Sequence, residues 1–140
     1  MTIQIAFAAL CDHAVVDQHG KLSAIGIWRQ VMVATLPGVH PRAHLVMLTS
    51  GTRDEVGEHR MSITLRGPGD ELTLEHNGVL GMPTPPPGVE LIESPGIMVL
   101  DLPLSSPGEH AIVVTIDGHE AARVPFTVGV MAPPVPGQVH

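Results

Sequence analysis

Nine histidines are the residues of this sequence with the clearest chemical potential, because imidazole binds metals and titrates near neutral pH. His40 and His44 are four residues apart, but four residues of extended strand span about 13 Å, which is too far to chelate one ion. His59 and His76, each beside a glutamate, could approach one another across a hairpin and form a zinc site. Surface histidines are the simpler interpretation, and the sequence predicts no metal site.

The other reactive side chains do not assemble into a recognisable catalytic motif. No serine lies in a nucleophile elbow, and no glycine-rich stretch follows a strand and opens a helix. We therefore expect a protein that is not an enzyme, with no catalytic residue and no cofactor. A deep pocket with converging aspartate and histidine side chains would revive the enzyme interpretation.

The alternative is a small-ligand-binding protein or enzyme that uses loops at one end of the fold. Prolines at both ends of the stretch from Pro37 to Pro41 predict a loop, since proline cannot donate to a strand ladder. The first residues to inspect in a ligand loop around residues 37–42 are Trp28, His40 and Arg42.

The elements that position these residues are expected to be β-strands. The last long apolar run, residues 107–128, alternates in hydrophobicity on both sides of Asp117 and Gly118, which is typical of a β-hairpin. A three-residue loop with Gly118 in the left-handed conformation would bring the apolar positions of both strands onto one face. That face carries Ile112, Val114, Ile116, Ala122, Val124, Phe126 and Val128. Pro125 predicts that the second strand runs at an edge.

A second hairpin is predicted from the segments MSITLR and ELTLEH, joined by a four-residue loop over residues 67–70. This loop length pairs Met61 with His76 and Arg66 with Glu71, and the second pair has opposite charges.

The rest of the chain continues in the same pattern. We expect further strands at residues 3–11, 21–34, 43–49 and 97–104, with a bend near Gly26. No window has a sustained period of 3.6 residues. The sequence therefore predicts an all-β fold, an antiparallel immunoglobulin-like β-sandwich of about eight strands with almost no helix. Residues 1–130 would form a single domain and residues 131–140 a Pro-rich tail.

Four stretches of the sequence resemble one family. They are an FA-x-L strand near the start, GKLSAIGIW, LPGVHPR and the closing PGEHAIVVTIDGHEAARVPFTV. The chain resembles an uncharacterised family of small bacterial proteins that carry a domain of unknown function, and the resemblance covers nearly its whole length. It implies a β-sandwich and no catalytic residues. The closing hairpin also resembles the last two strands of bacterial immunoglobulin-like domains, which typically place tyrosine where this chain has His110.

Charge and cysteine content exclude several classes of function. The formal net charge is -7, the 7 basic residues are scattered, and there is no tyrosine, so we expect no nucleic-acid partner. No run approaches the roughly 18 apolar residues of a membrane span, and no signal-peptide pattern is present. The one cysteine, Cys11, fits a small core residue in a reducing compartment. These features predict a soluble, cytoplasmic protein without membrane insertion.

The balance of apolar and charged residues favours association with another protein. Apolar residues make up 44% and charged residues 15%, against a typical charged content of about 25%. Several strands are apolar on both faces, and cover by the Pro-rich loops would be the alternative explanation. We therefore expect a non-enzymatic structural or protein-interaction module that self-associates as a homo-oligomer or docks on a larger assembly. The predicted interface residues are Ala111, Val113, Thr115, Ile97 and Val99.

Overall fold

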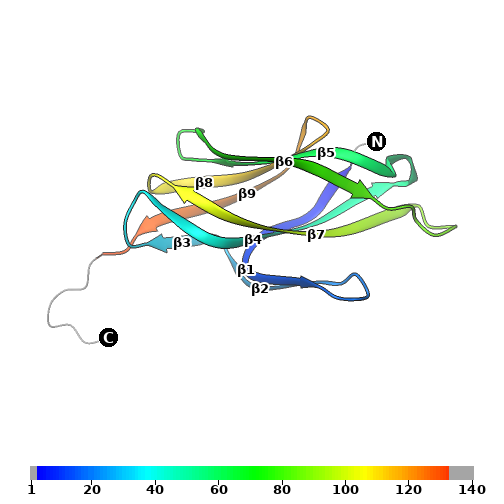
Figure 1. Cartoon of the computed structure of the whole chain (residues 1–140), viewed down its shortest axis with the longest axis horizontal. Coiled ribbons are helices and arrows are strands. Elements are labelled where there is room, and N and C mark those ends of the chain that lie inside the picture. Colours follow the sequence, from blue (N-terminus) through cyan, green and yellow to red (C-terminus); the bar gives the residue numbers. More distant parts are fainter. Residues whose placement is uncertain (1–2, 133–140) are drawn as a thin grey trace.

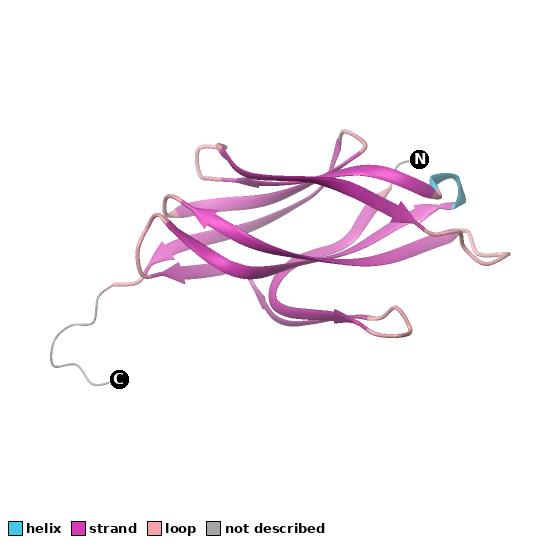
Figure 2. Ribbon diagram, viewed as in Figure 1, coloured by secondary structure: helices cyan, strands magenta, loops and turns pink. Residues whose placement is uncertain are grey.

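Strand-forming sequence extends almost without interruption from Gln4 to Val130, and it folds into nine β-strands with one short 3-10 helix (Figure 2). The structure is a computed structural model that describes residues 3–132, so the predicted tail lies outside the described residues from Pro133 onward. In chain order the elements are β1 (Gln4–Val16), β2 (Leu22–Trp28), β3 (Gln30–Val33), β4 (Gly38–Thr52), η1 (Arg53–Glu55), β5 (Gly57–Arg66), β6 (Leu72–Met82), β7 (Leu91–Leu104), β8 (Gly108–Ile116) and β9 (His119–Val130).

The strands form two sheets that pack face to face (Figure 1). Sheet A has the strand order β2-β1-β4-β7, and sheet B has the order β3-β9-β8-β5-β6. All neighbouring strands are antiparallel except β3 and β9, which run parallel. The predicted all-β sandwich with almost no helix is confirmed. Within residues 3–132, no helix has the length and hydrophobicity needed to cross a lipid bilayer.

The inner faces of the two sheets enclose the main hydrophobic core. Its largest fully buried side chains are Phe126, Leu10, Leu45, Ile63 and Leu65. They come from β9, β1, β4 and β5, so both sheets contribute. Burial of each such side chain stabilises the fold by roughly 1.5–3 kcal/mol.

Residues 21–34 form two strands where the sequence predicted one. β2 ends at Trp28 in sheet A, and β3 begins at Gln30 in sheet B, so Arg29 carries the chain from one sheet to the other. Gly26 has a φ of 69°, consistent with the expected bend. The crossing left no signal in the sequence, because alternation of side chains continues within each strand on either side of it.

The β8–β9 hairpin has a two-residue loop, so the predicted three-residue loop is wrong. Asp117 and Gly118 have φ values of 50° and 84°, the conformation of a type I′ turn. A one-residue register shift follows between Val114 and Thr115. Because the bulge adds one residue to β9, the apolar side chains of β8 and β9 beyond it lie on one common face, as predicted.

The β5–β6 hairpin has the predicted faces but a different register. His76 pairs with Ile63 instead of Met61, and Arg66 pairs with Leu72 instead of Glu71. The turn is longer than expected because it includes Glu71, whose carbonyl oxygen accepts a hydrogen bond from the Gly67 amide at 3.0 Å. The slide of two residues up to Leu65 keeps those side chains on their predicted faces, because the strand period is two. The bulge at Arg66 then places Leu72, which is 46% exposed, opposite Arg66 instead of on the predicted apolar face.

Most of the predicted loop over residues 37–42 is strand, since β4 begins at Gly38. Pro41 and Arg42 lie in a bulge in the pairing of β4 with β7. Arg42 has a φ of 53°, and its backbone N–H donates to Asp101 Oδ1 at 2.9 Å. The prediction of a loop is wrong because the bulge leaves Pro41 outside the regular ladder of hydrogen bonds, where its missing N–H is tolerated.

A register shift in the pairing of β1 with β4, between Ile5 and Phe7, reverses the faces of β1. Ile5 contacts the main core before the shift, whereas Leu10 does so after it. Cys11 then points to the outer side of sheet A and is fully buried in a small second apolar cluster. This cluster contains Ala9, Cys11, Ala14 and Val46.

Candidate functional site

On the side of the sandwich where β1 faces β9, two strand edges have no partner among the described strands. β1 pairs with β2 only from Leu10 onward, so residues 4–9 keep one open edge. β9 pairs with β3 only over Thr127–Val130, so residues 119–126 keep another. β1 and β9 contact each other here, and we call this region the open side.

The open edge of β1 lacks the usual protection against strand pairing. Its sequence, QIAFAA, contains no charged residue and no proline, which are two devices that keep edge strands from pairing with other chains. The open edge of β9 contains Pro125, in agreement with the predicted edge position.

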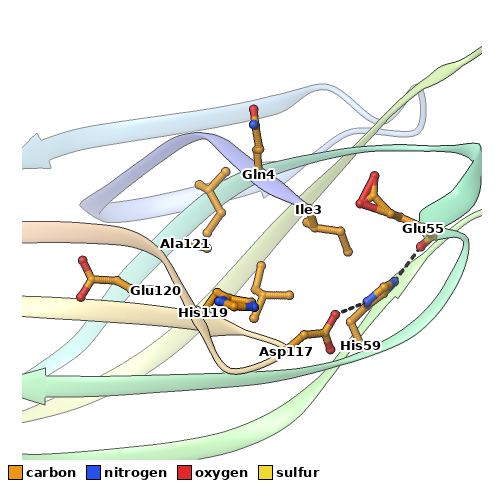
Figure 3. Close-up of a pocket in the computed structure, with 10 residues that line it drawn as sticks. Ile3, Gln4, Glu55, His59, Asp117, His119, Glu120 and Ala121 are labelled. Carbon is orange, nitrogen blue, oxygen red and sulfur yellow. Dashed lines mark hydrogen bonds and ion pairs between the residues drawn. The ribbon is translucent and has the colours of Figure 1, made fainter. Parts of the chain in front are cut away.

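A cavity of about 490 Å³ lies at the end of the open side where β1 begins. Figure 3 shows its wall, which comes from β1, the end of η1, β5 and the turn between β8 and β9. It is lined by Ile3, Gln4, Ile5, Glu55, His59, Ile116, Asp117, His119, Glu120 and Ala121. The cavity therefore combines apolar walls with carboxylate and imidazole groups.

His59 holds two elements together at this cavity. Its Nδ1 lies 2.6 Å from Asp117 Oδ2, and its Nε2 lies 2.7 Å from the backbone carbonyl oxygen of Glu55 (Figure 3). Both partners are acceptors, so both ring nitrogens must donate, and the ring is the imidazolium cation in this geometry. The hydrogen bond to the Asp117 carboxylate is the main reason why the pKa of His59 is raised above its usual value.

Asp117 is held in turn by the hairpin. Its Oδ1 accepts the backbone N–H of Arg60 at 3.1 Å, while its own backbone N–H donates to the Arg60 carbonyl oxygen at 2.9 Å. The hydrogen bond from His59 lowers the pKa of Asp117 below its usual value. Asp117 thus connects the β8–β9 turn to β5.

Glu55 is buried, with only 6% of its surface exposed. Its Oε1 accepts hydrogen bonds from the Thr52 backbone N–H at 2.8 Å and from Thr52 Oγ1 at 3.0 Å. The backbone hydrogen bond is the main reason why the pKa of Glu55 is lowered. Its Oε2 is buried and has no hydrogen-bond partner. The folded protein therefore favours a charged carboxylate that is satisfied on one oxygen only.

The other charges at the cavity are paired. Asp117 is balanced by His59, and Glu120 Oε1 lies 3.0 Å from Nη2 of Arg123. Glu55 forms no ion pair with any described residue. His59 is nearby, but its two N–H groups are used by other acceptors. Within residues 3–132, Glu55 is therefore the carboxylate of this cavity that forms no ion pair.

This geometry does not suit His59 for general base catalysis. A catalytic His–Asp pair keeps the second ring nitrogen free to face a substrate, whereas Nε2 of His59 is bound to a carbonyl oxygen. No group of three or more potential metal ligands is found within the described part of the chain. The hydrogen bonds of His59 and Asp117 join the end of η1, β5 and the β8–β9 turn.

A family model matches most of the chain and shows which protein family it belongs to. Residues 6–129 match the Family of unknown function (DUF6941). The chain belongs to this family. The predicted resemblance to an uncharacterised family is thereby confirmed. No curated protein sequence matches the chain.

Solved structures with similar folds include an immunoglobulin-like protein from Pseudomonas aeruginosa, with 13% identity and a TM-score of 0.43 over 91% of this chain and 97% of that one. Another is the alkylpurine DNA glycosylase AlkC of Pseudomonas fluorescens bound to DNA containing an abasic site analog, with 8% identity and a TM-score of 0.47 over 91% of this chain. The chain spans 30% of the glycosylase chain. These likenesses concern the fold alone, and the two sheets of the chain form a β-sandwich, as predicted.

Two of the three predicted ligand-loop residues contact each other in the structure. The rings of Trp28 and His40 meet edge to face with centroids 4.9 Å apart, and Trp28 also contacts Phe126 at 5.6 Å. Arg42 is exposed in the bulge of β4. Trp28 lines a smaller cavity of about 170 Å³ on the open side, and its indole nitrogen is buried without a partner. A ligand role for these residues stays a prediction.

The predicted interface residues fall into two groups. Ala111 and Val113 are 8% and 7% exposed, and Thr115 is half-buried, so the back of the closing hairpin offers little apolar surface. The cross-strand neighbours of Ala111 explain this, because Arg66 and Pro125 flank it on both sides. Ile97 and Val99 in β7 form the other group. Ile97 packs against the second cluster, and Val99 is 47% exposed.

The histidine pairs considered for metal binding are not assembled. His59 pairs with Leu80 across the hairpin, four residues from His76. His44 is buried, and its Nδ1 lies 3.0 Å from the carbonyl oxygen of Arg42. His110, at the position where immunoglobulin-like domains typically have tyrosine, is buried and stacks on Phe126 with centroids 5.3 Å apart.

Sequence reasoning missed Glu55 and its cavity. One local signal was available, because Thr52 and Glu55 have the spacing of a capping box, which places a carboxylate against a backbone N–H. The convergence of Glu55 with His59 and Asp117 had no such signal, since the three come from η1, β5 and the β8–β9 turn.

Proposed function

We propose that the protein is a non-enzymatic protein-interaction module that binds an extended segment of a partner protein along its open side. The observation that carries the proposal is the pair of open edges, residues 4–9 of β1 and residues 119–126 of β9, on the same side of the sandwich. Open edges present N–H and C=O groups that an added strand can satisfy.

The sequence of the open edge supports this assignment. An extended segment beside β1 would continue sheet A in the position that β2 leaves at Trp28. The alternating side chains of β1 would form pockets for the side chains of the incoming strand, and Phe7 is 44% exposed there. The predicted cytoplasmic location is part of the proposal, and the buried free thiol of Cys11 is compatible with it.

Selection of peptides on the purified protein tests the proposal. A displayed library of random peptides of about 10 residues, enough to cover one strand, provides the ligands. We expect selected peptides to bind with micromolar affinity and to slow amide hydrogen exchange in residues 4–9 and 119–126. Absence of binders, or protection confined to other strands, would rule out strand addition on the open side.

A matched pair of variants sharpens this test. Ala6→Lys places a cation on the exposed, open edge of β1, whereas Val79→Lys places one at a site 61% exposed on β6. We expect Ala6→Lys to weaken peptide binding at least about tenfold and Val79→Lys to leave it unchanged. Equal effects of the two substitutions would show that the peptide binds through general electrostatics.

Self-association is a second candidate, favoured by apolar side chains exposed on the strands of sheet A. Phe7, Ile25, Ile27 and Val99 are 44%, 65%, 55% and 47% exposed. Large exposed apolar surface commonly marks a contact between proteins. Light scattering at micromolar concentration should then give a mass above 14.8 kDa that Ile27→Asp reduces. A monomer in both samples would exclude this candidate.

A further inference from the structure

The open side ends in a carboxylate that forms no ion pair with the residues that the structure describes. Glu55 is more than nine-tenths buried and lines the cavity where β1 begins, and its Oε2 accepts no hydrogen bond. In Figure 3 the side chain of Glu55 extends from its backbone toward the side of the cavity where Ile3 and Gln4 lie. A carboxylate oxygen can accept about two hydrogen bonds, so this atom has unused capacity at a buried position.

The chemistry of the missing partner follows from the charges. Asp117 and Glu120 form ion pairs with His59 and Arg123, whereas Glu55 forms none with any residue from 3 to 132. A donor that carries positive charge would gain most at such a site, because charge-assisted hydrogen bonds are roughly twice as strong as neutral ones. A buried carboxylate also gains more from a cation than an exposed one, since water screens it less.

An organic cation fits this cavity better than a metal ion. The described residues contain no group of three potential metal ligands, and both oxygens of Asp117 are already used by His59 and Arg60. An ammonium or guanidinium group needs only Glu55 and nearby carbonyl oxygens as acceptors. The volume of about 490 Å³ is ample for the end of a lysine or arginine side chain.

We propose that the Glu55 cavity binds the cationic side chain of the partner segment that adds along β1. This inference rests on the proposed function, because strand addition brings the partner residue to the end of the open side. The partner is therefore an extended segment with apolar residues at alternate positions and a lysine or arginine at the position that reaches Glu55. The net charge of -7 favours approach of such a basic segment.

A small cation tests the cavity without any peptide. The probe is n-butylammonium, with n-butanol as the neutral control of the same shape, and the readout is the carbon chemical shift of the Glu55 carboxylate. We expect a saturable shift with n-butylammonium and none with n-butanol. No saturable shift with the cation, or the same shift with the alcohol, would overturn the proposal. Use of n-butylguanidinium in a parallel titration distinguishes a lysine-type from an arginine-type site.

Glu55→Gln is the decisive variant, because glutamine keeps an oxygen for the two hydrogen bonds from Thr52 and removes only the charge. Its matched control is Glu58→Gln, which removes an exposed carboxylate three residues away. We expect binding of n-butylammonium to weaken at least about tenfold in Glu55→Gln and to stay unchanged in Glu58→Gln. Equal binding in the two variants would contradict the role of Glu55. The wild-type carboxylate shift gives an answer even if Glu55→Gln does not fold.

A peptide experiment separates this inference from the function on which it rests. In a selected peptide that protects the β1 amides, lysine is replaced by uncharged norleucine. We expect binding to the wild type to weaken at least about tenfold and binding to Glu55→Gln to be insensitive to the replacement. Peptides that protect β1 without any dependence on a cation would refute the cation pocket and leave strand addition in place. Binding of n-butylammonium without peptide binding would refute strand addition and leave the cation pocket in place.

Discussion

The edge strands on the two lateral sides of the sandwich differ in their protection against pairing with further strands. On one side, β7 carries Pro95 and Pro103, and β6 exposes Glu75 and Asn77. Prolines and charges of this kind hinder the addition of further strands. On the open side, residues 4–9 of β1 have neither, and two cavities lie beside them.

The difference has a single topological cause. When the chain crosses from sheet A to sheet B at Arg29, it leaves the first half of β1 without a neighbour. The strand that it then forms, β3, is only 4 residues long and covers only the end of β9. One crossing therefore leaves both edges unpaired on the same side. The open side thus results from the connectivity of the strands and not from a sequence motif.

The first test of this comparison measures how tightly side chains pack on the two sides of the sandwich. Met82, at the end of β6, is 3% exposed in the main core, whereas Ile5 on the open side is half-buried. We expect Met82→Ala to lower the free energy of unfolding by about 2–5 kcal/mol and Ile5→Ala by about 1–2 kcal/mol, as measured by urea denaturation. Equal losses would show that the open side is packed as tightly as the core.

Glu55 provides the next test, because its hydrogen bonds to Thr52 should be its main contribution to stability. Glu55→Ala removes the oxygen that accepts both hydrogen bonds and should cost about 1–2 kcal/mol, as for the loss of a helix cap. Glu55→Gln keeps one oxygen and should cost less than about 1 kcal/mol. If Gln costs as much as Ala in thermal unfolding, Glu55 already has a counter-cation in the free protein.

The tie between His59 and Asp117 predicts a pH dependence of stability. The pKa of His59 is raised in the folded state, so its contribution is full below the unfolded value of about 6.5 and is lost as the pH rises through the folded value. The pKa of Asp117 is lowered, so its contribution is lost as the pH falls through the folded value, below about 3.8. The pair therefore stabilises the fold in the weakly acidic range.

Asp117→Asn tests this window, since asparagine tolerates the positive φ of the type I′ turn while removing the charge. We expect the variant to lose stability at about pH 5.5 and to lose less once the pH has risen above the raised pKa of His59. A loss independent of pH, followed by thermal unfolding, would mean that the carboxylate acts only through the turn.

The smallest expected effect concerns the open edge itself. Ala6 is exposed and lies at the register shift of β1, so Ala6→Lys should change the free energy of unfolding by less than about 0.5 kcal/mol. Urea denaturation checks this, with Val79→Lys as the comparison. A larger loss for Ala6→Lys would indicate that the edge is covered in the free protein.

Local patterns were enough to predict most of the strands and their faces. The alternation around Asp117 and Gly118 predicted the closing hairpin, and the segments on either side of residues 67–70 predicted the second one. The registers were less accurate, because bulges insert a residue at little cost and leave the alternation beyond them intact. The bulge at Pro41 likewise turned a predicted loop into strand.

The sequence by itself determined that this chain forms a β-sandwich, because hydrophobic alternation and turn residues act over a few neighbouring positions. Only the tertiary structure decided which edges stay open and that Glu55, His59 and Asp117 meet at one cavity. Those features depend on where the chain crosses between sheets at Arg29 and on long-range contacts such as that between His59 and Asp117, which are 58 positions apart. Such long-range contacts follow from the packing of whole sheets, which no local pattern encodes.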